Sequence, residues 1–205
     1  MNWDLDWDVN WDALVGIGTL ALAFATFLSV LAALFGQRLL DWWRRPRLVI
    51  AFKREEPFCR YTKTNWHDGP REGYWVRIDI ANEGLSPAHG LRGRLVAVRT
   101  EGAQRPDMDP MALRWAGVPD HMGFDPVVLA RGEHEYLNVA YVVDGESSVY
   151  IPTFPGFAPG NPTQLEPHRQ HQLNVAVFAD DADPAVITLT IVYGGTIDAL
   201  EVGLT

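Results

Sequence analysis

The chain has 205 residues and a formal net charge of −9, with 17 Lys and Arg against 26 Asp and Glu. This length suits one globular domain with an additional segment, and the acidic balance argues against a nucleic-acid-binding surface. The single cysteine, Cys59, excludes an internal disulfide and fits a reducing compartment.

Residues 1–12 form an acidic, tryptophan-rich tail in which two periods overlap. Apolar and polar residues alternate as in a strand, and Trp-Asp returns every fourth residue as on one helix face. We favour the helix, because a lone strand at a membrane surface would leave its backbone groups unpaired. The helix places Trp3, Trp7 and Trp11 within an arc of about 80°. We expect these three residues to lie at the outer membrane interface, and at least one of them to contact a neighbouring membrane protein.

Residues 13–35 are uncharged and mostly apolar. As a helix they would extend roughly 34 Å, enough to cross the ~30 Å hydrocarbon core of a bilayer. A cleaved signal peptide is the alternative, but it requires a basic segment before its apolar core. The preceding residues contain four Asp and no Lys or Arg, so we expect a permanent transmembrane helix.

Residues 36–46 form a basic, aromatic juxtamembrane segment. Trp42 and Trp43 suit the headgroup level, and Pro46 is expected to end the helix. Arginines follow the apolar span, and by the positive-inside rule they place the C-terminal domain in the cytoplasm and the N-terminus outside the inner membrane. The arginines are Arg38, Arg44, Arg45 and Arg47.

Residues 47–205 show short runs with the alternation of β-strands, separated by turn-forming clusters, and no sustained helical period. The pattern predicts a mainly β, antiparallel immunoglobulin-like sandwich, with a partly closed barrel as the alternative. Gly194-Gly195 suggests a final hairpin. The predicted strands are Arg47–Lys53, Gly73–Ala81, Leu91–Thr100, Pro126–Ala130, Tyr136–Val143, Leu173–Ala179 and Val186–Tyr193.

Two stretches between the predicted strands are interpreted as long loops. The first covers residues 55–72, and the second covers residues 152–168 and contains five prolines, which exclude a central strand. Phe154 and Phe157 in the second stretch are candidate partner contacts, because aromatic residues in a stiff loop lose little entropy on binding. The alternative is that both pack back as a lid over the core.

The order of these landmarks resembles a known group of proteins. An RRPRL segment follows the anchor, then come YWVRIDIANEGLSPAHGLRGRLV, LRWAG, VVLARGEHEYLNVAYV and LEPHRQHQLNVAVFADDADP. The series is similar to uncharacterised bacterial single-pass membrane-anchored proteins with a C-terminal immunoglobulin-like β-sandwich. His168 departs from the pattern, because a turn glycine is more usual there. The resemblance implies a fold and a membrane anchor, and it implies no activity.

Sequence motifs for catalysis or cofactor binding are absent. Neither Lys53 nor Lys63 follows a glycine, which excludes a P-loop, and Asn138 stands where an H-E-x-x-H zinc motif begun at His134 needs its second histidine. Val9 occupies the obligatory glycine position of a calcium loop begun at Asp4. We therefore expect no cofactor, no metal and no enzymatic activity.

Other chemistry-bearing residues are assigned structural roles. His168 and His171 are interpreted as surface histidines, because no acidic or cysteine partner stands at ligand spacing. Trp75 and Trp115 are interpreted as core residues rather than as a ligand platform. The acidic cluster near the C-terminus is interpreted as turn residues, namely Asp180, Asp181 and Asp183.

The favoured function is a non-enzymatic interaction or accessory subunit that binds or stabilises a membrane protein complex. The alternative is a cytoplasmic ligand sensor or effector that signals through an oligomerising transmembrane helix. The expected partners are the lipid bilayer and either other membrane subunits or further copies of the chain, without nucleic acid. Charge is uneven along the domain, since residues 46–116 carry 12 basic against 9 acidic residues and residues 117–205 carry 2 against 12.

Overall fold

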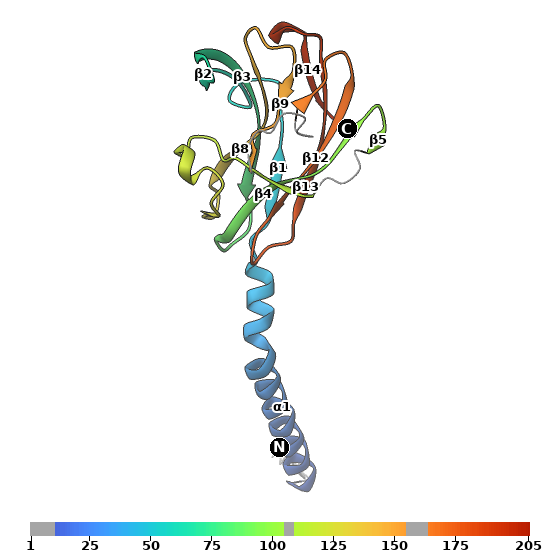
Figure 1. The fold of residues 1–205 in the computed structure, drawn as a ribbon. Coiled ribbons are helices and arrows are strands. Elements are labelled where there is room, and N and C mark those ends of the chain that lie inside the picture. The colour runs from blue at the N-terminus through green and yellow to red at the C-terminus, as the bar shows by residue number, and fades with distance from the viewer. Residues whose placement is uncertain (1–10, 105–108, 155–163) are drawn as a thin grey trace, which may run out of the picture. The chain divides into compact units, whose positions relative to one another are not determined.

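The structure is a computed structural model that describes residues 11–104, 109–154 and 164–205. It divides into two compact units, one ending at Arg44 and one running from Arg45 to Thr205. The first unit contains one helix, and the second contains the β-strands (Figure 1).

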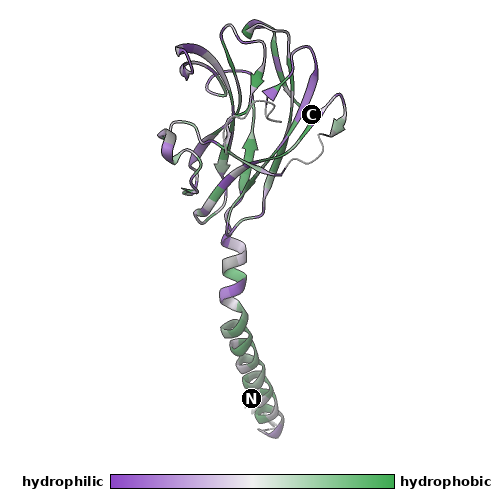
Figure 2. Cartoon of the chain, in the orientation of Figure 1, coloured by the Kyte–Doolittle hydropathy of each residue, from purple (hydrophilic) through white to green (hydrophobic). Residues whose placement is uncertain are grey.

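Helix α1 runs from Trp11 to Arg44, two residues before Pro46, whose ring disfavours helical geometry in the preceding residue. An 18-residue window within residues 14–44 has a mean hydropathy of 2.2, and the helix is long and apolar enough to cross a membrane. Figure 2 shows hydrophobic residues along most of the helix and hydrophilic ones near its C-terminal end. Its few hydroxyl groups donate to the carbonyl four residues earlier, which satisfies them without water, as in Thr19, Thr26 and Ser29.

The second unit consists of two antiparallel sheets that face each other without closing, which confirms the predicted sandwich and excludes the barrel. The first sheet has the order β1-β3-β8-β9-β11, with β2 also paired to β3. Its strands are β1 (Leu48–Ala51), β2 (Cys59–Trp66), β3 (Gly69–Asn82), β8 (His134–Val143), β9 (Val149–Tyr150) and β11 (Gln164–Leu165).

The second sheet has the order β10-β6-β4-β12-β13-β14, and β5 and β7 also pair with β4. Two short 3-10 helices, η1 (Asp120–Met122) and η2 (Ile197–Ala199), lie in connections. The strands are β4 (Ala88–Thr100), β5 (Ala103–Gln104), β6 (Met111–Leu113), β7 (Val127–Leu129), β10 (Thr153–Phe154), β12 (Gln170–Phe178), β13 (Ala185–Tyr193) and β14 (Leu200–Leu204).

All seven predicted strands are present, and the predicted final hairpin is β13–β14. The interpretation of residues 55–72 as a loop is wrong, because β2 lies there and forms a hairpin with β3. In this edge strand the partly buried side chains are Thr62, Thr64 and Trp66, so no apolar alternation marks it in the sequence.

The core between the sheets is mostly aliphatic. From β3 it takes Val76, Ile78 and Ile80, all fully buried, and from β12 it takes Leu173 and Val175. His171 continues the same inward face of β12, so its prediction as a surface residue is wrong. Its ring nitrogens lie 3.0 Å from Thr100 Oγ1 and 2.8 Å from the Glu166 carbonyl oxygen.

Asn82 ends the inward face of β3 and holds the point where the chain enters the sandwich. The side chain is fully buried. Its oxygen accepts from the amides of Arg47 (3.2 Å) and Gly84 (3.0 Å), and its nitrogen donates to the carbonyls of Ser86 (2.8 Å) and Leu129 (3.0 Å). All four bonds go to backbone groups, so this one amide fixes the turn of residues 82–86 against β1 and β7.

Two predicted turns also have a clear structural basis. His168 has a φ of 61°, the left-handed conformation in which a glycine is more usual, and its amide donates to the Tyr193 carbonyl (2.7 Å). In the β12–β13 turn, Asp181 Oδ1 accepts from the amide of His89 (3.0 Å), and Asp180 pairs with Arg92 at 3.2 Å. The acidic cluster thus consists of turn residues, as predicted.

Candidate functional site

The outer face of the first sheet has a different chemistry from its inner face. Trp75, Arg77 and Asp79 alternate along β3 with the core residues, so their side chains point away from the second sheet. Trp75 belongs to a separate buried aromatic cluster with Tyr141 and Tyr150.

A β-bulge in β8 completes this outer face. The pairing passes from Val76↔Ala140 to Arg77↔Asn138, so Val139 is the extra residue. Asn138 and Tyr141 are three positions apart and would point to opposite faces of a regular strand. With the bulge both face outward: the Tyr141 and Trp75 rings stack with centroids 4.4 Å apart, and Asn138 Oδ1 accepts from Arg77 Nε at 3.0 Å.

One wall over this face comes from β2. Trp75 Nε1 donates to Thr64 Oγ1 at 2.9 Å, which fixes the indole against the strand. A Cβ at Gly73 would lie 2.5 Å from that same Thr64 oxygen, so glycine is required for this close approach.

A second wall comes from the segment between β6 and β7. It pairs with the edge of β8, since the Asn138 amide donates to the Arg114 carbonyl (2.9 Å) and the Ala116 amide donates to the Tyr136 carbonyl (2.7 Å). The Trp115 indole donates to the Asp125 carbonyl at 3.1 Å, which closes the segment on itself. Both walls are therefore fixed by hydrogen bonds within the protein.

These elements enclose a cleft of about 440 Å³, with Ile151–Thr153 as its third side. Small-molecule sites typically have volumes of roughly 300–1,000 Å³. In the part of the chain that the structure describes, its charged lining residues are all cations. The lining residues are Thr62–Asn65, Trp75, Arg77, Arg114, Trp115, Gly117, Phe124, Asn138, Tyr141 and Ile151–Thr153.

Arg77 is the half-buried cation on the floor of the cleft. Among the residues that the structure describes, no carboxylate lies within 4.0 Å of it, and Asn138 is its hydrogen-bond partner. Burial lowers the pKa of Arg77, and the positive charge of Arg60 lowers it further. An arginine remains charged at neutral pH in such a setting, so Arg77 brings to the cleft a positive charge that no described carboxylate within 4.0 Å neutralises.

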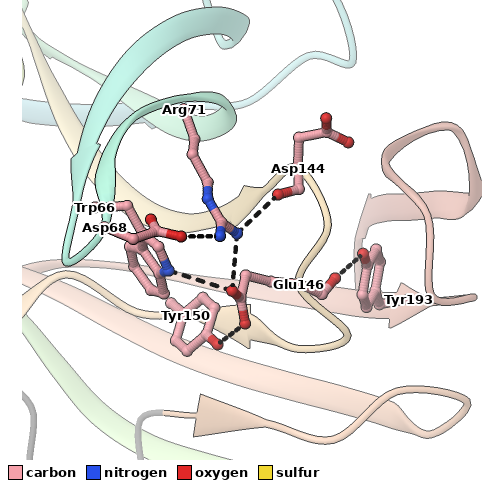
Figure 3. Close-up of polar contacts among 7 residues, drawn as sticks. All are labelled: Trp66, Asp68, Arg71, Asp144, Glu146, Tyr150 and Tyr193. Atoms are coloured by element: carbon pink, nitrogen blue, oxygen red, sulfur yellow. Dashed lines mark hydrogen bonds and ion pairs between the residues drawn. The ribbon is translucent and has the colours of Figure 1, made fainter.

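A polar network supports the β2–β3 wall at its hairpin end (Figure 3). Glu146 accepts from Trp66 Nε1 and Arg71 Nη1 at 3.2 Å and from the Tyr150 hydroxyl at 3.1 Å. Its backbone carbonyl accepts from the Tyr193 hydroxyl of the second sheet at 2.8 Å. Asp68 also pairs with Arg71. The network ties the β2–β3 hairpin to the β8–β9 turn and to β13.

Two tyrosines of the aromatic cluster stay protonated far above neutral pH. Burial, followed by the neighbouring Tyr150, raises the pKa of Tyr141 to about 12. Burial, followed by Glu146, raises the pKa of Tyr150 to about 12. The Tyr141 phenol therefore enters the cleft as a neutral hydrogen-bonding group.

None of the predicted site residues that the structure describes is a lining residue of the cleft. Trp11, Trp42 and Trp43 are exposed on α1, Arg44 is its last residue, and Arg45 and Arg47 are exposed on either side of Pro46. Trp3, Trp7 and Phe157 lie outside the described residues.

Phe154 is 62 % exposed beside Phe124, with ring centroids 5.6 Å apart, so it does not pack back over the core as the lid alternative requires. Trp115 is a core residue, as predicted, and it also lines the cleft. Trp75 is buried, but outside the main core and in the cleft. The sequence signal that could have identified Trp75 as a cleft residue is the Trp75-x-Arg77-x-Asp79 alternation, because it places Trp75 on the polar face of its strand.

Comparison of the chain with protein-family models, with curated proteins and with solved structures finds no match. The structure itself shows an N-terminal apolar helix followed by an antiparallel, β-rich sandwich.

Proposed function

We propose that the protein is a single-pass, membrane-anchored, non-enzymatic binding module whose sandwich takes a small molecule into the cleft on its first sheet. The observation that carries the proposal is the cleft itself, about 440 Å³ in volume and framed by hydrogen-bonded walls. Preformed, partly apolar cavities with a few converging polar groups are the usual form of small-molecule sites. Of the alternative function, a ligand sensor or effector that signals through an oligomerising transmembrane helix, this proposal adopts the binding of a ligand.

The accessory-subunit hypothesis stays a prediction. Three of its five candidate contact residues, Trp3, Trp7 and Phe157, lie outside the described residues. The exposed Trp11, Trp42 and Trp43 are equally suited to lipid headgroups and to another subunit.

We further propose the topology that the sequence predicts, with the helix in the inner membrane, the N-terminus outside and an immunoglobulin-like domain in the cytoplasm. The arginines after the apolar span support this orientation. A reporter fused after Thr205 tests it: activity of a cytoplasmic reporter is expected, and activity restricted to a periplasmic reporter would overturn the orientation.

The ligand proposal is tested by blocking the cleft. Thr62→Trp places an indole on a half-buried wall position, and Thr188→Trp makes the same change at a half-buried position of β13 that does not line the cleft. The full chain in detergent is incubated with a small-molecule fraction of host cells and examined by native mass spectrometry. We expect the wild type and Thr188→Trp to retain a small molecule and Thr62→Trp to lose it. Equal retention by Thr62→Trp, or none by the wild type, would contradict the proposal.

A further inference from the structure

We infer that the ligand of the cleft is a small organic anion, a carboxylate or phosphate attached to a planar ring, with its acidic group held by Arg77 and Arg114. This inference rests on the proposed function and specifies the chemistry of the same site. It is carried by the charge of the lining, by the surroundings of Arg77 and by the shape of the cleft.

The charge of the cleft is opposite to that of the domain. Residues 46–205 carry 14 Lys and Arg against 21 Asp and Glu, yet the charged residues of the described cleft lining are Lys63, Arg77 and Arg114. Low-dielectric walls around charges of one sign concentrate the potential inside a cleft. A small anion is attracted there and is repelled by much of the remaining surface.

The partial burial of Arg77 is energetically unfavourable, and a bound anion would offset this free-energy cost. Moving a guanidinium part-way out of water without a counter-charge is unfavourable, and Arg60 adds repulsion. Its Nε is engaged by Asn138, which orients the planar group on the floor of the cleft. Guanidinium groups bind carboxylates and phosphates through paired N–H donors, the geometry that a fixed Nε prepares.

Arg114 provides the second cation from the wall formed by the segment between β6 and β7. The Nη2 atom of Arg114 donates to the Val118 carbonyl at 3.4 Å. The Arg114 side chain also packs closely over Gly123, because a Cβ atom at that glycine would lie 2.9 Å from the Cγ and Nε atoms of Arg114. Its charge also acts on the Tyr141 phenol, lowering that group's pKa against the larger effect of burial. The two guanidinium groups and the neutral phenol are therefore part of one site.

The apolar part of the cleft indicates a ring. Trp75, Trp115, Phe124 and Tyr141 line it together with Ile151 and Pro152. A volume of about 440 Å³ exceeds what a single inorganic anion needs, and flat aromatic side chains pack well against planar molecules.

The test compares acids with their neutral analogues by titration calorimetry on the full chain in detergent. The probes are benzoate with benzamide, indole-3-acetate with indole-3-acetamide, AMP with adenosine, and inorganic phosphate alone. We expect at least one acid to bind in the low millimolar range or below, at least about tenfold more tightly than its neutral partner, with an affinity that falls as salt rises. Equal binding within every pair, or no binding of any acid in that range, would overturn the anion inference.

Arginine variants locate the acidic group. Arg77→Gln is expected to lower acid affinity at least about tenfold and to leave the neutral analogue unchanged. Arg99→Gln removes the same charge from an exposed position on β4 of the second sheet and is expected to bind like the wild type. Arg77→Lys keeps the charge without the planar fork and should be intermediate.

The melting temperature of each variant without ligand shows whether it is folded. If folded Arg77→Gln binds acids like the wild type, the assignment of Arg77 is wrong. Failure of this inference is distinguishable from failure of the proposed function. If neutral ligands bind and Thr62→Trp prevents their binding, the cleft is still a ligand site. Only the preference for anions would then be wrong.

Discussion

The two faces of the first sheet are built from the same strands but by different physical means. The inner face of β3 presents Val76, Ile78 and Ile80, which are fully buried and need only close packing against the second sheet. The outer face presents Trp75 and Arg77, which are held by hydrogen bonds and ring stacking beside a cleft. The inner face accounts for stability, and we assign binding to the outer face.

The largest effect is expected on the inner face. Ile78→Ala removes a fully buried side chain from β3 and should lower the free energy of unfolding by about 2–5 kcal/mol. Val186→Ala at the exposed end of β13 is the matched control and should cost less than about 0.5 kcal/mol. Denaturant unfolding measures both. Similar losses for the two variants would contradict the assignment of stability to the inner face.

Asn82 tests whether a buried polar residue on the inner face stabilises the domain as well as an aliphatic residue does. Asn82→Ala leaves two backbone amides and two carbonyls without their partner, and we expect a loss of about 2–3 kcal/mol. Asn174→Ala on β12, a half-buried residue facing away from the core, is its control. A loss below about 1 kcal/mol for Asn82→Ala would show that water replaces the four bonds.

Glu146 connects the two faces through its network. Glu146→Ala leaves Arg71 with fewer partners and removes the acceptor for Trp66 and Tyr150, so a loss of about 1–2 kcal/mol is expected. Because the network supports the β2 wall, binding in the cleft should weaken too. Glu72→Ala, an exposed neighbour on β3, should change neither quantity. Unfolding and calorimetric titrations check both expectations.

The outer face should also make the protein sensitive to alkali. Tyr141 and Tyr150 have pKa values of about 12 against an ordinary value of 10.0. Since the folded state holds these protons more tightly than the unfolded state, their contribution to stability is complete below pH 10 and is lost as pH rises towards 12. Tyr141→Phe removes one of the titrating phenols, so its stability should fall less steeply over this range. An unchanged slope in Tyr141→Phe would contradict the assignment.

The smallest change in stability is expected at Arg77. Arg77→Met removes a half-buried cation that has no carboxylate within 4.0 Å among the described residues, which favours folding, and it also removes the donor to the buried Asn138 Oδ1, which disfavours folding. Because the two effects oppose each other, we expect the stability of the ligand-free protein to change by less than about 1 kcal/mol. A loss above about 1 kcal/mol would make Arg77 a structural residue.

The inner face was largely predictable from the sequence. The period of two in Gly73–Ala81 identified β3 and its inward residues, because an aliphatic face is a local pattern. β2 was missed because an edge strand with threonines on its partly buried face carries no such pattern. His171 was misassigned because its neighbours Leu173 and Val175, rather than its own polarity, decide which way it points.

The cleft was not predictable to the same degree. Trp75, Arg77 and Asp79 share one face in the sequence, which signals an unusual surface, but the bulge at Val139 that adds Asn138 and Tyr141 depends on strand pairing. Arg114 and Phe124 reach the cleft through hydrogen bonds to β8, a contact between segments distant in the sequence. The site is assembled from five segments, so no fixed sequence spacing could have revealed it as a motif.

An experimental structure of the full chain with a bound ligand would show whether a small molecule occupies the outer face of the first sheet. We expect ligand density in the cleft between Arg77 and Arg114, with the aromatic walls in their present positions. Density for the ligand on another surface, with the cleft left empty, would contradict this expectation.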